Sequence, residues 1–140
     1  IVEVTRDQAQ WGYRHSMMAD AGYVVVEATL ELTSDAQAEI QARMDDFHTR
    51  RVEKQPLEMP SAGSTFKRPE GYFAGKLIQD AGLRGYKVGG AQVSEKHTWF
   101  VVNAGGATAA DVRQLIADVQ ARVKEEFGVE LEPEVKMWGF

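Results

Sequence analysis

The sequence contains no cysteine, and this absence excludes several kinds of chemistry. Without a thiol there is no disulfide framework, no thiolate zinc site and no cysteine nucleophile. The 16 Lys and Arg residues are outnumbered by 21 Asp and Glu residues, and the resulting net charge of −5 argues against a general nucleic-acid binder. No apolar run approaches the ~20 residues of a membrane span, so nothing points to a membrane. The three histidines show no metal-ligand spacing, and neither a phosphate loop nor a dinucleotide fingerprint occurs.

The remaining composition is typical of a globular protein. Hydrophobic residues make up 44% of the 140 positions, which is enough for a buried core. A chain of this length forms one ordinary domain, or one domain and a piece of another. It opens on Ile1-Val2-Glu3-Val4 rather than on Met, as if partway along a strand. We therefore expect a piece of a longer protein, or a processed product.

The first half of the chain predicts two strands and a helix. The strands are expected at residues 1–4 and 23–32, the second being β-branched and alternating near its end. Ser34 should cap a helix that runs to about Glu53, with an apolar face formed by Ile40, Met44 and Phe47. Two prolines then end this helix and begin an extended connector.

The second half predicts a mixture of helices and strands. A helix is expected over residues 70–81 and a buried strand over residues 99–102. The strongest helical pattern begins with a capping box at Thr108 and Asp111, and its apolar stripe comprises Val112, Leu115, Ile116, Val119, Val123 and Phe127. Residues 129–138 should form a final strand, at an edge or with a bulge because a proline interrupts it. Strands and helices without a βαβ rhythm indicate an α+β fold.

A small-residue turn, Ser61-Ala62-Gly63-Ser64, presents hydroxyls beside a glycine, where the backbone can approach a ligand closely. Ser and Gly also favour turns that have no function. The segment is not the Gly-x-Ser-x-Gly elbow of hydrolases, because Ala62 and Phe66 occupy the glycine positions. Basic residues flank the turn, and they suit a diphosphate or simply a solvated helix end: Arg50, Arg51, Lys54, Lys67 and Arg68.

Two further segments have both a functional and a structural interpretation. The pair Gly89-Gly90 opens a polar stretch, which allows either the close approach of a ligand or a tight turn or bulge. In the final strand, alternation places Glu132 and Glu134 on one face and Leu131 and Val135 on the other. These carboxylates could orient a cation or share a proton in a pocket, or they could face solvent.

The order of several segments is more specific than any one of them: Tyr13-Arg14-His15-Ser16, Gly63-Ser64-Thr65-Phe66-Lys67-Arg68-Pro69, Gly75-Lys76-Leu77-Ile78, Gly82-Leu83-Arg84-Gly85, Gly89-Gly90-Ala91-Gln92-Val93-Ser94, Asn103 and Leu131-Glu132-Pro133-Glu134-Val135. Over essentially all 140 residues this order resembles the C-terminal half of the UDP-N-acetylenolpyruvoylglucosamine reductases. The resemblance implies a cytoplasmic enzyme of peptidoglycan precursor synthesis. NADPH reduces FAD in this family, and the enolpyruvyl group of the UDP-sugar is then reduced to give UDP-N-acetylmuramate.

The resemblance also implies a domain division. Residues 1–54 match the end of the FAD-binding region, and residues 55–140 match the substrate-binding domain. The family's FAD-binding fold lies mostly before the position of residue 1. We therefore expect this chain alone to lack most of the flavin site and to be inactive by itself.

Residue roles carry over by position. Ser64 matches the proton donor, Arg14 matches the arginine that polarises the substrate carboxylate, and Glu134 matches the glutamate that assists it. Arg14 and Gly63 are also expected beside the cofactor. The expected substrate-binding residues are Arg51, Lys54, Lys67, Arg68 and His97, although Arg68 stands where the family often has Asn.

Two other hypotheses remain open at this point. One is a UDP-sugar-binding module without catalysis. The other is a hydrolase that uses Ser64 with His97 and Glu134, against which the missing nucleophile elbow argues.

Overall fold

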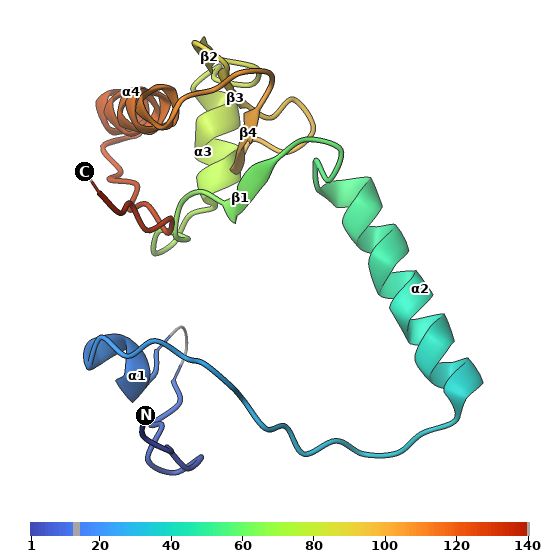
Figure 1. Cartoon of the computed structure of the whole chain (residues 1–140). Coiled ribbons are helices and arrows are strands. Elements are labelled where there is room, and N and C mark those ends of the chain that lie inside the picture. Colours follow the sequence, from blue (N-terminus) through green and yellow to red (C-terminus); the bar gives the residue numbers. More distant parts are fainter. Residues whose placement is uncertain (13–14, 140) are drawn as a thin grey trace. The chain divides into compact units, whose positions relative to one another are not determined.

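The computed structural model describes residues 1–12 and 15–139 and divides into two units, Ile1–Ala36 and Gln37–Phe140 (Figure 1). In the first unit a single helical turn, α1 (Met17–Asp20), follows a bridge between Gly12 and His15. The strands predicted at residues 1–4 and 23–32 are wrong, because both segments lack a paired neighbour in the described part of the chain. A strand needs a partner for its backbone N–H and C=O groups. The apolar side chains of the second segment are consequently exposed: Val24, Val25, Val26, Leu30 and Leu32.

The predicted first long helix is confirmed as α2 (Gln37–Lys54), although Ser34 lies too far ahead of it to be its cap. Its apolar face is present but not buried. Ile40, Met44 and Phe47 are exposed by 38%, 59% and 63%. A helix with an apolar stripe normally packs that stripe against another element. No such element is found among the described residues of α2's unit.

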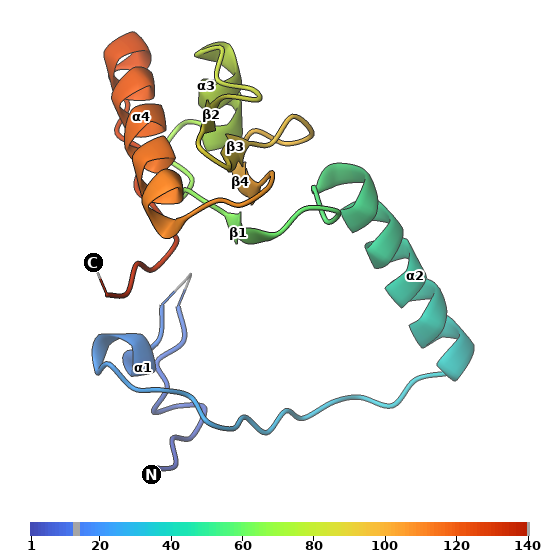
Figure 2. The ribbon, with the colours of Figure 1, turned by 45° about the horizontal axis from the view of Figure 1, so that its top comes forward.

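The centre of the second unit is a four-stranded antiparallel sheet with the order β1-β4-β3-β2. Its strands are β1 (Ser61–Ser64), β2 (Lys87–Val88), β3 (Ala91–Val93) and β4 (Phe100–Asn103). Helix α3 (Ala74–Asp80) and the longer α4 (Ala109–Phe127) pack against each other, and α4 also contacts β2 and β3 (Figures 1 and 2). The α+β prediction is confirmed.

The strongest predicted helix is confirmed with its ends. The hydroxyl of Thr108 accepts from the Asp111 N–H at 3.1 Å, and the Asp111 carboxylate accepts from the Thr108 N–H at 2.9 Å. These bonds, the backbone one first, hold the pKa of Asp111 below its ordinary value. At the other end Gly128 has a left-handed conformation, with φ of 69°.

The predicted final strand, residues 129–138, is wrong. The chain there makes one isolated bridge, between Phe66 and Pro133. Proline has no N–H to continue a ladder, so pairing stops after the residues that flank it. The helix predicted over residues 70–81 is also shorter, because only Ala74–Asp80 is helical.

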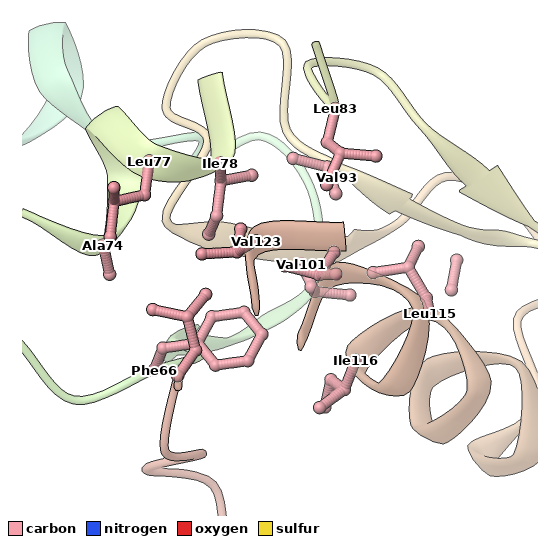
Figure 3. Close-up of a cluster of buried hydrophobic side chains, with 13 residues drawn as sticks. Phe66, Ala74, Leu77, Ile78, Leu83, Val93, Val101, Leu115, Ile116 and Val123 are labelled. Atoms are coloured by element: carbon pink, nitrogen blue, oxygen red, sulfur yellow. The ribbon is translucent and has the colours of Figure 1, made fainter. Parts of the chain in front are cut away.

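A single hydrophobic cluster joins the sheet to α3, α4 and the last segment of the chain (Figure 3). Its largest fully buried side chains are Phe66, Ile78, Leu115 and Ile116. Every buried member of the cluster lies between Phe66 and Leu131. In the described part of residues 1–54, by contrast, only Ala9 is buried among the apolar side chains.

The location of the core predicts that residues 55–140 fold without the preceding segment. Deleting residues 1–54 should lower the free energy of unfolding by less than about 1 kcal/mol, because no core contact is lost. Urea unfolding followed by tryptophan fluorescence measures this. As a control, Ile78→Ala in the same shortened chain should cost about 2–5 kcal/mol. A shortened chain without a cooperative transition would contradict the prediction.

Candidate active site

A β-bulge shapes the turn before Ser64. Ser61 pairs with Val102 and Ser64 with Phe100, so three residue steps on β1 span two on β4. The extra residue is accommodated at Ala62-Gly63, where Gly63 has φ of 86°. A residue with a side chain is strained in that conformation, which explains the glycine. Bulges re-aim the residue that follows them, and here that residue is Ser64.

The two neighbouring hydroxyls after the bulge have different environments. The Thr65 side chain is buried, and its oxygen accepts from the Val101 N–H at 3.1 Å. Ser64 is half-buried, and its hydroxyl has no hydrogen-bond partner in residues 1–12 or 15–139. Thr65 therefore serves the sheet, whereas the Ser64 hydroxyl is available to a ligand.

The last segment of the chain places Glu134 next to this turn. The Glu134 N–H donates to the Thr65 carbonyl at 2.9 Å, and the Lys67 N–H donates to the Glu132 carbonyl at 2.8 Å. Leu131 is buried and Val135 packs on the core, as predicted for the apolar face of this segment. The Glu132 carboxylate is engaged by the Lys67 ammonium. The backbone of the half-buried Glu134 is thus held beside Thr65, the residue that follows Ser64.

The five basic residues around the turn divide by their contacts. Arg50 pairs with Asp46 in its own helix at 2.8 Å. Lys67 pairs with Glu132, and the Arg68 guanidinium lies 4.1 Å from the centre of the Phe73 ring. Arg51 and Lys54, in the last turn of α2, have no ion-pair partner within the described ranges. These two charges are therefore available to an anion.

An open pocket of about 400 Å³ lies beside α3 and the loop between β3 and β4. Its lining combines aromatic, basic and polar side chains: Phe73, Lys76, Gln79, Arg84, Lys96, His97 and Trp99. Of these, sequence reasoning identified only His97. The others come from residues 73–79, Arg84 and the residues that flank His97, and these segments meet only in the fold. Aromatic faces and cations together suit a nucleotide.

His97 is held in place by its neighbours. The Trp99 N–H donates to its Nδ1 at 3.3 Å, and its ring meets Phe100 edge-on with the centroids 5.5 Å apart. Burial, followed by the charge of Arg84, lowers the pKa of His97 below its ordinary value. The lowered pKa favours the neutral ring, and Nε2 is the nitrogen left for a ligand. No hydrogen bond joins His97 to Ser64, so the described residues lack the nucleophile–base contact of a hydrolase.

The pair Gly89-Gly90 has a structural role. It forms the hairpin turn between β2 and β3, and Gly90 packs directly on the backbone of the loop between β4 and α4. A Cβ at position 90 would lie 2.7 Å from the Cα of Ala107 and closer still to the Gly105 carbonyl oxygen. The close approach at Gly90 is thus between two segments of the chain, the hairpin turn and the loop between β4 and α4.

One predicted residue, Arg14, lies outside the described residues. In the ranges that are described, no group of three His, Asp or Glu side chains could hold a metal ion. Nor is any helix in those ranges both long and apolar enough to cross a membrane.

Comparison with known proteins gives a match over residues 55–138, to the family described as UDP-N-acetylenolpyruvoylglucosamine reductase, C-terminal domain. The chain belongs to this family. Over 136 residues, or 97% of the chain, it is 64% identical to the UDP-N-acetylenolpyruvoylglucosamine reductase of Agathobacter rectalis. It is 60% identical to the enzyme of that name from Clostridium perfringens over 139 residues, or 99% of the chain.

A solved structure agrees with these relatives. The UDP-N-acetylenolpyruvylglucosamine reductase (MurB) of Thermus caldophilus superposes with a TM-score of 0.72 and 38% identity, and covers 94% of this chain. The chain spans less than half the length of these proteins: 43% and 46% of the two relatives, and 47% of the solved structure. The family resemblance seen in the sequence is therefore confirmed, for the C-terminal portion of the reductase.

Proposed function

We propose that this chain is the C-terminal part of a reductase that converts UDP-N-acetylglucosamine enolpyruvate into UDP-N-acetylmuramate, with FAD as cofactor and NADPH as reductant. The reaction supplies a peptidoglycan precursor in the cytoplasm. One observation carries the proposal. The bulge leaves the half-buried Ser64 hydroxyl available. The Glu134 backbone N–H, from the last segment of the chain, donates to the carbonyl of Thr65, the residue after Ser64. The family membership gives this pair its chemistry.

The proposal includes the domain division at residues 54 and 55. The core contains only residues from Phe66 onward, which supports a separate substrate-binding domain at residues 55–140. The exposed apolar faces of residues 23–32 and α2 support assignment of residues 1–54 to the FAD-binding region, which would cover them.

The surroundings of Gly63 fit a flat cofactor. A Cβ built at Gly63 would meet nothing within 4 Å, so the backbone of the bulge is open to a ring that approaches it. FAD, when bound, supplies the hydride that it receives from NADPH. Gly63, together with Arg14, would lie beside it. The other contacts to FAD would come from the FAD-binding region.

The chain's own residues would handle the proton and the negative charge. When hydride adds to one carbon of the enolpyruvyl double bond, charge builds on the substrate carboxylate. The Arg14 guanidinium would stabilise this charge, and Glu134 would assist it. Ser64 would donate its proton to the adjacent carbon, which completes the lactyl group. A hydroxyl is a weak acid, so the transfer depends on Ser64 being held close to that carbon.

The UDP portion would bind at the pocket and the nearby basic residues. His97 Nε2 and the aromatic rings of Phe73 and Trp99 suit a nucleobase. Arg51 and Lys54 would hold the diphosphate, since their charges lack a protein partner among the described residues. Lys67 and Arg68 would contribute less, because each is already engaged.

A substitution experiment tests this assignment. Changing Arg51 and Lys54 to Ala should weaken UDP binding by about 1.5–3 kcal/mol for each charge-assisted hydrogen bond removed. Titration calorimetry with a full-length reductase that includes this chain measures the effect. Arg50→Ala is the matched control, because that guanidinium pairs with Asp46 and should not matter. Equal affinities in all three proteins would mean that Arg51 and Lys54 form only a solvated helix end.

A further inference from the structure

Lys96 connects the pocket to the end of α2. Its side chain is 35% exposed and lines the pocket, yet its ammonium donates to the Val52 carbonyl at 2.6 Å. Val52 is in the last turn of α2, where the carbonyl groups lack partners within the helix. The Glu58 carboxylate lies 4.0 Å from the same ammonium. A cation at this position also complements the negative end of the helix dipole.

The base of Lys96 is fixed from the core. The hydroxyl of Ser94, which is buried, accepts from the backbone N–H groups of Lys96 and His97, each at 3.2 Å. The same turn therefore orients His97 toward the pocket and Lys96 toward α2. Few other links are available to α2, because none of its described side chains is buried.

We propose that Lys96 is a positioning residue for the UDP diphosphate. It holds the last turn of α2, and with it Arg51 and Lys54, in a fixed place relative to the His97 pocket. The charges of Arg51 and Lys54 can then bind the same ligand as the nucleobase site. This inference rests on the proposed function, and it assigns to Lys96 an effect that passes through α2 rather than through contact with the substrate.

A double-mutant cycle tests the route of this effect. In a full-length reductase that includes this chain, Lys54→Ala, Lys96→Met and the double variant are compared by calorimetric titration with UDP. If Lys96 acts through the helix end, each single change weakens binding at least ~10-fold, and the double variant is no more than ~3-fold weaker than Lys96→Met. If Lys96 binds UDP directly, the two effects multiply, and the proposal is overturned.

Two variants serve as controls. Lys96→Arg should bind UDP within ~3-fold of the parent, because a guanidinium can also donate to the Val52 carbonyl. Lys76→Met removes another pocket-lining lysine, but one paired with Asp80 in its own helix at 2.7 Å. Its effect on UDP binding, whatever its size, should multiply with that of Lys54→Ala. A loss in Lys96→Arg equal to that in Lys96→Met contradicts the proposal.

Hydrogen exchange without ligand provides a second readout. The Gln55 N–H donates to the Arg51 carbonyl at 2.8 Å and reports on the helix end. Its exchange should accelerate about 10-fold in Lys96→Met and remain unchanged in Lys96→Arg and Lys76→Met. Unchanged exchange in Lys96→Met overturns the inference. If the parent protein binds no UDP, the proposed function fails, and the exchange rates still decide whether Lys96 holds the helix.

Discussion

Replacing Ser64 with alanine should slow the reduction of the enolpyruvyl substrate by about 10²–10⁴-fold, the usual effect of losing a general acid. The first half-reaction, in which NADPH reduces the enzyme, should remain nearly intact because it needs no proton on the substrate carbon. Stopped-flow absorbance of a full-length reductase that includes this chain separates the two steps. The half-buried position of Ser64 after the bulge also predicts a small effect on stability.

Other variants distinguish proton donation from charge stabilisation. Ser64→Cys should recover part of the rate, since a thiol can also donate a proton. Glu134→Ala and Arg14→Ala should slow the same half-reaction through the developing charge. Glu132→Ala is the matched control for Glu134, because Glu132 is engaged by Lys67. If Ser64→Ala instead slowed reduction by NADPH and spared the second step, Ser64 would belong to the nicotinamide or flavin site.

Gly90→Ala should destabilise the protein by about 3 kcal/mol or more. The new Cβ would lie 2.7 Å from the Cα of Ala107, well inside the ~3.5–4.0 Å of a normal carbon contact. The loop between β4 and α4, which contains Ala107, cannot easily move away from the new Cβ. The Asn103 side-chain oxygen accepts from the N–H groups of Gly105 and Ala107, at 2.9 and 3.1 Å. Chemical unfolding measures the loss.

Gly75→Ala is the control for this prediction. A Cβ at Gly75 would come no closer than 3.4 Å to His97 and Trp99, and the residue is in α3, where alanine is the better helix former. Its free energy of unfolding should stay within about 1 kcal/mol of the parent. Similar stabilities of the two variants would show that the hairpin and the loop move apart at little cost.

The sequence predicted best the elements that depend on local interactions. Helix α4 appeared with its capping box, its apolar stripe and its terminal glycine, because all of these act within a few residues of one another. The predicted strands at residues 1–4, 23–32 and 129–138 did not form, because pairing depends on a partner that local sequence does not specify. Strand β4 did form, since β1 and β3 flank it on both sides.

The same distinction applies to the site. The sequence by itself identified the family, the Gly63-Ser64 turn and the two candidate carboxylates, because residue types and their order carry that information. Only the tertiary structure decided which groups are available. In the fold, the Glu132 carboxylate pairs with the Lys67 ammonium, the Thr65 hydroxyl accepts a hydrogen bond within the sheet, and the Lys96 ammonium donates to a carbonyl of α2. Those contacts connect residues that are 36 to 65 positions apart, and only packing of the whole unit brings such residues within hydrogen-bond distance.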